Sequence, residues 1–266
     1  MNNRPKPKAM PFLEHHQLPR IDAQQKAPVL IAGMHNSGTS ILAEILHKNG
    51  VFLGNNMSHY ESYFFSVFIN DRLIMGSDES WAKLPLMSIG EVMSYKDTVG
   101  PFIAKHWIAD YLQCGYDGGS MWGIKDPRLC VLLPLYLDIF PGAKVVHIRR
   151  NPDDVAASLC RRKKYGVGKL NDIEHWKKLT LEYTDRVIEY SDKASAYFEL
   201  DYETFCTQTE PVTQSLFEFL GIPFTGETKD LLSKVTPSKI GSYEKYQKGV
   251  EKRFPAIGRR LIEKIR

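Results

Sequence analysis

The chain has 266 residues, of which 43% are hydrophobic and 25% are charged, an ordinary composition for a soluble globular enzyme with a sizeable core. The formal net charge of +4 is too small to indicate a nucleic-acid-binding protein. No apolar run approaches the roughly 18 residues that a membrane span needs, so we expect no transmembrane segment.

The first twenty residues lack the apolar segment of a secretory signal, and we therefore predict a cytoplasmic protein. Residues 1–27 are rich in Pro, Lys, Asn and Gln and are predicted to form a flexible tail. Residues 28–266 are predicted to form a single domain. The cysteines are isolated in the sequence, which indicates reduced thiols and neither a disulfide framework nor a zinc site. They are Cys114, Cys130, Cys160 and Cys206.

A short apolar run over residues 29–32 predicts the first strand, and a glycine loop and a helix follow it. The spacing Gly33-x4-Gly38 between a strand and a helix is typical of a phosphate cradle, because loop N–H groups and the helix N-terminus point at one anion. A nucleoside triphosphatase has Lys directly after the second glycine. Here Thr39 and Ser40 follow, so the sequence predicts a cradle without the lysine of an ATP or GTP site.

The following elements alternate between helices and short strands. Gly50 is predicted to end the first helix, and residues 50–54 to turn the chain. Residues 60–107 are predicted to be mainly helical, with breaks at Pro85, near Gly90 and at Gly100-Pro101. Further strands are expected over residues 121–124, 144–148 and 197–200, and further helices over 129–140, from 153 onward and over 211–220.

This alternation predicts a three-layer α/β/α fold with a central parallel sheet, similar to that of P-loop nucleotide triphosphatases. Ligands bind such sheets at the carboxyl ends of the strands. Four predicted strands end at Gly33, Lys125, Arg150 and Asp201-Tyr202. We therefore expect these residues to converge on one crevice.

The strand over residues 144–148 ends in two arginines, where a magnesium-dependent kinase has a metal-binding Asp. Arg150 is a forked, permanently charged donor suited to a phosphate, and Ser158 on the following helix can add a hydroxyl. The alternative is that Arg150 only pairs with Asp153 or Asp154. Two anion sites and no metal carboxylate suggest a metal-free site for a nucleotide with phosphates at both ends of its ribose.

Five motifs in order resemble those of sulfotransferases that use 3′-phosphoadenosine 5′-phosphosulfate (PAPS), of the kind common in bacteria. The resemblance covers residues 28–223 and implies a P-loop-like sulfotransferase domain. The motifs are GMHNSGTS at residues 33–40, KDPR at 125–128, RNPDDVAAS at 150–158, Tyr202-Glu203, and FLGIP at 219–223.

The resemblance also implies roles for the loop residues. It assigns the 5′-phosphate and the sulfuryl bridge to Ser37, Gly38, Thr39 and Ser40. The family usually has Arg or Lys just before this Ser-Gly-Thr, where this chain has Asn36. An amide can donate a hydrogen bond but brings no charge. His35 and Lys125 are the candidates to compensate for that missing charge.

At the other end of the nucleotide, the resemblance assigns the 3′-phosphate to Arg150 and Ser158 and places Tyr202 near the adenine. A buried aromatic side chain at a strand end is the alternative for Tyr202. The family's third cofactor segment, near the C-terminus, has several candidates and no clear match. They are Lys239, Tyr243, Lys245 and Lys248-Gly249.

For the chemistry, the resemblance implies that Lys125 stabilises charge growing on the bridging oxygen, together with loop amides and Thr39. Cytosolic members of the superfamily use a histidine two residues after this lysine, but Pro127 stands there. Relatives that act on carbohydrates, and many bacterial members, have a glutamate soon after the first helix. Glu61 is therefore our candidate base, with His59 as the reserve.

The predicted function is transfer of a sulfuryl group from PAPS to an acceptor hydroxyl without a metal, with 3′,5′-adenosine bisphosphate as product. A carbohydrate acceptor is mildly favoured, while a lipid-linked sugar, a peptide tyrosine and a small alcohol or phenol stay open. The alternatives are a P-loop kinase of a small molecule and a nucleotide-binding protein with little catalysis. The sequence does not indicate the oligomeric state.

Overall fold

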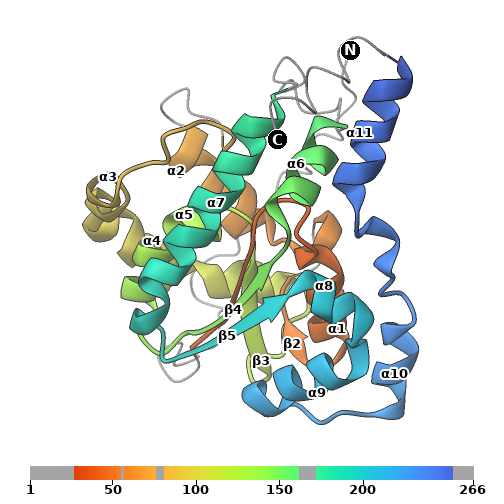
Figure 1. Ribbon diagram of the computed structural model, residues 1–266. Coiled ribbons are helices and arrows are strands. Elements are labelled where there is room, and N and C mark those ends of the chain that lie inside the picture. The colour runs from red at the N-terminus through yellow and green to blue at the C-terminus, as the bar shows by residue number, and fades with distance from the viewer. Residues whose placement is uncertain (1–26, 55–56, 76–80, 162–171, 254–266) are drawn as a thin grey trace, which may run out of the picture.

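The structure, a computed structural model, describes residues 27–54, 57–75, 81–161 and 172–253. Nearly all of the predicted tail lies outside them. Five parallel strands form one sheet in the order β2-β3-β1-β4-β5 (Figure 1). Their bounds are β1 Val29–Ala32, β2 Val51–Phe52, β3 Met121–Lys125, β4 Lys144–Arg149 and β5 Ala196–Asp201.

Helices surround this sheet. The α-helices are α1 Thr39–Lys48, α2 Arg72–Met75, α3 Ile89–Ser94, α4 Lys96–Gln113, α5 Leu129–Ile139, α6 Pro152–Cys160, α7 Ile173–Tyr190, α8 Tyr202–Thr207, α9 Thr209–Leu220, α10 Gly226–Leu232 and α11 Ser242–Arg253. Shorter turns are the 3-10 helices η1 Ser58–Tyr60, η4 Ser191–Lys193 and η5 Pro237–Lys239, and η2 Phe64–Asp71 is a π-helix. No helix in the described ranges is both long and apolar enough to cross a membrane.

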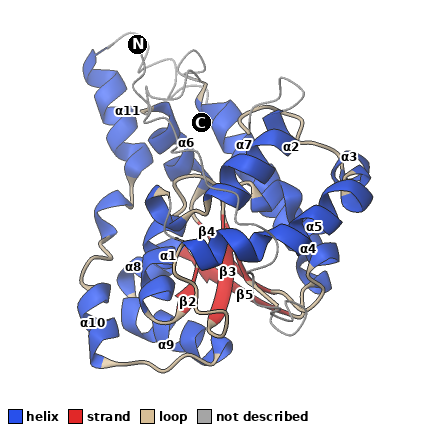
Figure 2. Cartoon of the chain, turned by 180° about the vertical axis from the view of Figure 1, so that it is seen from behind, coloured by secondary structure: helices blue, strands red, loops and turns tan. Residues whose placement is uncertain are grey.

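The sheet is buried on both faces, because alternate strand residues point to opposite sides. Leu30 and Val145 belong to an apolar cluster with residues of α4, α5 and α7, while Ile31 and Val146 belong to a second cluster with α1, α8 and α9. The sheet therefore lies between two helical layers (Figure 2). This arrangement confirms the predicted three-layer α/β/α fold with a parallel sheet.

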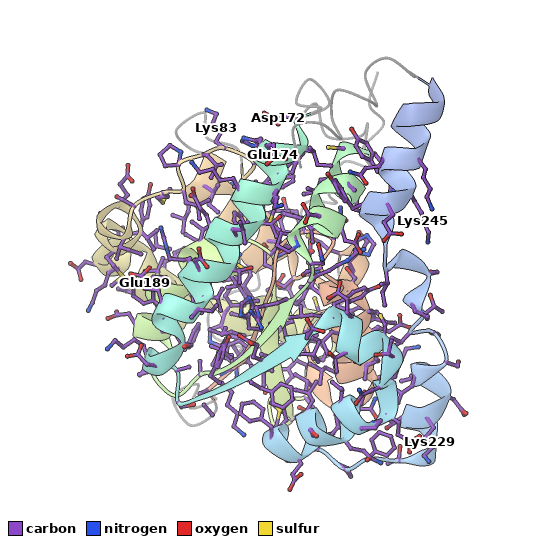
Figure 3. The ribbon with its side chains drawn as sticks, viewed as in Figure 1. Lys83, Asp172, Glu174, Glu189, Lys229 and Lys245 are labelled. Atoms are coloured by element: carbon purple, nitrogen blue, oxygen red, sulfur yellow. The ribbon has the colours of Figure 1, made fainter. Side chains whose placement is uncertain are left out.

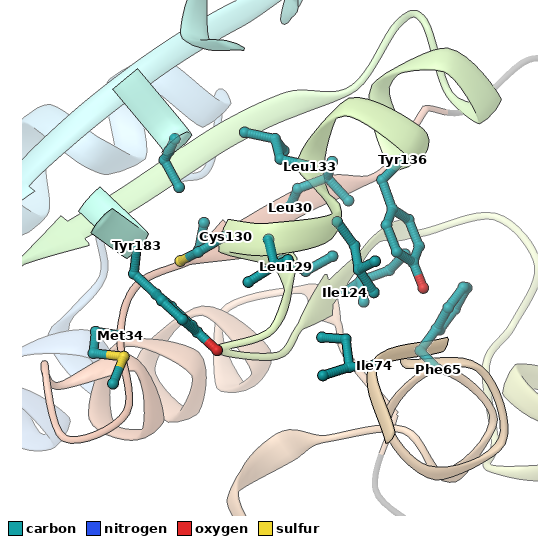
Figure 4. Close-up of a cluster of buried hydrophobic side chains, with 14 of the residues drawn as sticks. Leu30, Met34, Phe65, Ile74, Ile124, Leu129, Cys130, Leu133, Tyr136 and Tyr183 are labelled. Carbon is teal, nitrogen blue, oxygen red and sulfur yellow. The ribbon is translucent and has the colours of Figure 1, made fainter. Parts of the chain in front are cut away.

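The larger cluster reaches as far as the glycine loop. Leu30 and Ile124 of the sheet pack with residues of α5 and α7, and Met34 of the loop lies near Tyr183 of α7 (Figure 4). Charged side chains such as Glu189 point outward from the helices (Figure 3). The loop is thus attached to the core by its own buried methionine.

Three local features differ from the sequence-based expectation. The predicted break at Gly100-Pro101 is wrong, because α4 continues through both residues and buries Ile103, Trp107 and Tyr111 against the core. That burial outweighs the one backbone hydrogen bond that a proline removes. Residues 51 and 52, predicted as a turn, form an edge strand on β3. The helix predicted from residue 153 onward, without a stated end, is described as two separate helices, α6 and α7.

His147 gives the fold a built-in acid sensitivity. Its imidazole is buried in β4, with Nδ1 2.9 Å from the Tyr197 hydroxyl. Burial, together with the charge of Arg149, lowers the pKa of His147 from 6.5 to about 3. Below pH 6.5 the His147 side chain is therefore protonated in the unfolded chain, while in the folded chain it stays neutral until the pH approaches 3. Stability from this group is complete above pH 6.5 and is lost as the pH falls toward 3.

We predict that His147→Gln makes unfolding less dependent on pH. In the wild type this histidine should lower the free energy of unfolding by up to about 1.4 kcal/mol per pH unit below 6.5. Urea unfolding at several pH values between 7.5 and 4.5 measures the slope. The exposed His59, replaced as His59→Gln, is the matched control and should leave the slope unchanged. Equal slopes for the wild type and His147→Gln would contradict the prediction.

Candidate active site

The glycine loop joins β1 to α1 at the carboxyl edge of the sheet, as predicted. Ser37 closes the turn, since its backbone N–H and its hydroxyl both donate to the carbonyl of Met34, at 3.1 and 2.6 Å. Asn36 has φ 69° and Gly38, which precedes α1, has φ 102°. Asn is the non-glycine residue that best tolerates this left-handed conformation, so the loop geometry accounts for an Asn at position 36.

Gly38 also needs to be glycine because a ring lies directly beside it. A Cβ at this position would come within 2.5 Å of the Tyr202 ring. Tyr202, the first residue of α8, is buried under the loop. The ends of β1 and β5 therefore converge as predicted, and they do so through a direct contact between the glycine loop and the Tyr202 ring. Tyr202 is buried, as the alternative interpretation of this residue expected.

Arg150, just after β4, connects to the same loop. Its Nη1 donates to the carbonyl of Asn36 at 2.7 Å, and its Cζ lies 4.8 Å from the centre of the Tyr202 ring. The Arg150 side chain is 1% exposed and its Nη2 is 3.7 Å from Asp154. The alternative pairing with Asp154 is thus present, but at a longer distance than the contact with the loop.

On the other side of β1, Lys125 ends β3 beside the candidate base. Its Nζ lies 2.6 Å from Oε1 of Glu61, and the two side chains are 2% and 19% exposed. The pairing of Ile31 with Lys125 in the sheet places this ion pair next to the end of β1. The structure therefore brings together the predicted cation, the predicted base and the glycine loop.

The segment around Glu61 is held in a particular shape. His59 and Tyr60 both have left-handed backbones, at φ 67° and 58°, which is unusual for consecutive non-glycine residues. The hydroxyl of Ser62 donates to Asp110 of α4 at 2.7 Å. His59 is exposed and makes no hydrogen bond or ion pair within the described part of the chain. The structure places Glu61, and not the reserve base His59, against Lys125.

A buried ion-pair network continues from Lys125 along the KDPR motif. Asp126 accepts from the backbone N–H, Nε and Nη2 of Arg128 at 2.7 to 2.8 Å, and Arg128 also pairs with Asp71 at the end of η2. Burial and the charge of Glu61 raise the pKa of Asp126, whereas the N–H groups of Arg128 favour its ionised form. The network attaches the π-helix η2 to the end of β3.

The remaining predicted residues have simpler positions. His35 lies against Trp81, with ring centres 4.0 Å apart and the ring planes tilted by 40°. Thr39 is buried and Ser40 is half-buried in the first turn of α1. Ser158 is half-buried on α6, two turns beyond Arg150.

A model of the sulfotransferase family matches residues 28–226 of this chain. The chain belongs to the sulfotransferase family. This membership confirms the predicted family resemblance, and the matched range includes the glycine loop, the KDPR motif, Arg150 and Tyr202.

Solved sulfotransferase-family structures share this fold. The sulfotransferase domain from the curacin biosynthetic pathway superposes with a TM-score of 0.53 at 14% identity, covering 82% of each chain. The domain from the olefin synthase of Synechococcus PCC 7002 gives a TM-score of 0.50 at 18% identity, covering 76% of this chain and 77% of that one. At these identities the likeness concerns the fold alone.

One sequence relative is much longer than this sulfotransferase-family chain. An uncharacterized protein of Aquifex aeolicus (strain VF5) is 25% identical over 250 residues, which is 85% of this chain but 29% of that protein. The chain therefore spans less than a third of the length of this relative.

Sequence reasoning missed some of the contacts around the family motifs. The KDPR motif predicted no role for Asp126 or Arg128, although an Asp and an Arg two residues apart already suggest an ion pair. The contact of Trp81 with His35 of the glycine loop had no signal in the sequence. The position of residues 241–243 against Arg150 had no local signal, because the contact joins segments about 90 residues apart.

We predict that Gly38→Ala destabilises the protein by about 2–4 kcal/mol, because it combines left-handed backbone strain with a collision against Tyr202. Gly50→Ala is the matched control, since Gly50 has φ 98° and nothing lies within 4 Å of the added Cβ. It should cost only the strain, about 1–2 kcal/mol. Urea unfolding gives both values. Equal losses would show that the Tyr202 contact is not tight.

Proposed function

We propose that this chain transfers the sulfuryl group of PAPS to the hydroxyl of an acceptor. The observation that carries the proposal is the pair of cations on either side of the lysine-free glycine loop. Lys125 ends β3 and Arg150 follows β4, and β1 with its loop lies between these strands. A donor with one phosphate group at the loop and another at Arg150 matches this arrangement.

The residues present fit such a nucleotide. Nδ2 of Asn36 is buried and finds no hydrogen-bond acceptor in the described part of the chain, so an anion in the loop would satisfy it. Ser37, Gly38, Thr39 and Ser40 would hold the 5′ side through backbone N–H groups and hydroxyls. The Ser37 hydroxyl is already used within the loop, so its contribution would come from the backbone.

On the 3′ side, Arg150 and Ser158 would hold the phosphate, and Tyr202 would lie near the adenine. Arg150 is already oriented by the carbonyl of Asn36 and the face of the Tyr202 ring. A side chain oriented in advance loses little conformational entropy when it binds a ligand. This is the physical reason to prefer the phosphate-binding role over simple pairing with Asp154.

When bound, PAPS would supply the sulfuryl group, and 3′,5′-adenosine bisphosphate would be the leaving group. Lys125 is positioned to stabilise the negative charge of that departure. Glu61 is positioned to take the proton of the acceptor hydroxyl. In the structure Lys125 pairs with Oε1 of Glu61 at 2.6 Å, so Oε2 is the oxygen that would take the proton of the acceptor hydroxyl while the ion pair stays in place.

The acceptor is proposed only as a hydroxyl compound, with a carbohydrate mildly favoured because of the glutamate base. Trp81, half-buried with His35 of the loop and Trp176 of α7 as ring neighbours, is the aromatic side chain beside the loop that could contact a sugar ring or a flat apolar molecule. A small-molecule kinase is the alternative on the same fold. Arg150 in place of a metal-binding Asp favours sulfuryl transfer without a metal.

We predict that the protein binds 3′,5′-adenosine bisphosphate with micromolar affinity in the presence of EDTA and does not bind ATP. Calorimetric titration with the bisphosphate, 5′-AMP and ATP measures this. The 3′-phosphate should increase affinity over 5′-AMP because it contacts Arg150. Magnesium-dependent binding of ATP without binding of the bisphosphate would replace the sulfotransferase proposal with the kinase.

We predict that Glu61→Gln lowers kcat on any acceptor found with PAPS by about 10²–10⁴-fold, because the acceptor loses its base. Affinity for the bisphosphate should stay within twofold, since the predicted base does not hold the nucleotide. His59→Gln is the control and should keep its turnover. If His59→Gln were the inactive variant and Glu61→Gln active, the reserve assignment would be correct instead.

A further inference from the structure

The first residues of α11 lie against the site, far from the loop in sequence. Helix α11 packs on α6, the helix that begins two residues after Arg150 (Figure 1). Residues 241–243 form the turn into α11, with Gly241 at φ 70°. Of its residues, only Tyr243 was among the sequence-based candidates for a C-terminal cofactor segment.

The carboxylate of Asp154 holds this turn. Its Oδ2 accepts the backbone N–H of Gly241 and its Oδ1 accepts that of Tyr243, both at 2.8 Å. These donors lie at the N-terminus of α11, where backbone N–H groups have no partner within the helix. Asp154 is buried on α6 and thus caps a helix to which it does not belong.

The same turn brings Ser242 to Arg150. The Ser242 hydroxyl is 3.3 Å from Nη2 of Arg150, and Arg161 at the end of α6 donates to the Ser242 carbonyl at 3.2 Å. Ser242 lies between the two residues whose N–H groups Asp154 accepts. The backbone that carries this hydroxyl is therefore held by the Asp154 carboxylate.

We propose that Asp154 is a positioning residue that sets the preference of the site for a nucleotide with a 3′-phosphate. It holds residues 241–243 so that Ser242 orients Nη2 of Arg150, while the Asn36 carbonyl of the glycine loop orients Nη1. The inference rests on the proposed function, because it takes Arg150 as the group that binds the 3′-phosphate. Asp154 itself touches no ligand in this proposal.

The chemistry of the carboxylate makes the role testable. Two oxygens accept two N–H groups, whereas the amide of Asn has one oxygen and one NH₂ that would face an N–H. Asp154→Asn therefore keeps the size of the side chain but loses one of the two contacts, together with the 3.7 Å ion pair with Arg150. The turn is then held at one end only, and Ser242 no longer has a fixed position against Arg150. Ser242→Ala, described below, leaves the ion pair of Asp154 with Arg150 in place and so separates the two effects.

The experiment measures the affinities of the full chain for 3′,5′-adenosine bisphosphate and 5′-AMP by calorimetry. Asp154→Asn should bind the bisphosphate at least tenfold more weakly and 5′-AMP less than twofold more weakly. Asp153→Asn is the matched control, because it removes the same charge from the same turn of α6. Asp153 pairs with Lys177 and has no contact with residues 241–243 among the hydrogen bonds and ion pairs of the described residues. The Asp153→Asn variant should change neither affinity.

Ser242→Ala is the second variant, which keeps the backbone and removes only the hydroxyl beside Arg150. It should show the same selective loss, about three- to tenfold, even if Asp154→Asn does not fold. Unchanged affinities in both variants, or equal losses for both nucleotides, would overturn the inference. Failure of the wild type to prefer the bisphosphate would instead overturn the proposed function, so the two failures are distinguishable.

Discussion

The contacts of the Arg150 guanidinium are the interactions on which the rest of the site depends. A buried arginine is costly unless its donors are used, and here it contacts the Asn36 carbonyl, the Ser242 hydroxyl and the face of Tyr202. These contacts come from the loop after β1, from the start of α8 and from the start of α11. One charged group thus joins segments that span most of the domain, and it does so at the edge where the strands end.

The side of the loop that faces Lys125 is organised by a different set of charges. Lys125 pairs with Glu61, while Arg128 pairs with Asp126 and with Asp71 of the π-helix η2. Such pairs add little to stability on their own, because desolvation offsets their attraction. Their effect is on position: they hold the side chain of Glu61 against the end of β3 and attach η2 to the same strand. π-Helices are frequent at functional sites, in keeping with this placement of η2.

Much of the sheet could be predicted because its signals are local. Val145, Val146 and Ile148 form an apolar, β-branched run, and glycines mark the loop after β1. The edge strand β2 could not be predicted, since its two residues are strand only through pairing with β3. The continuity of α4 through Pro101 depends on burial of Trp107, which no local rule reveals. The same distinction holds for the site. Its candidate residues were proposed one by one from local motifs, whereas the contact of Asp154 with the start of α11 joins segments far apart in the sequence and had no local signal.

The strand order has a consequence for selectivity. Neighbouring strands are about 4.8 Å apart, so the ends of β3 and β4, two strands apart with β1 between them, are separated by about 10 Å. Backbone hydrogen bonds fix that spacing, and side-chain substitutions leave it unchanged. The sheet therefore sets the distance between the backbone positions that carry Lys125 and Arg150. Substitution of either residue changes only how far its side chain reaches from that position, so the strand order limits the spacing between two anionic groups that the proposed site can accommodate.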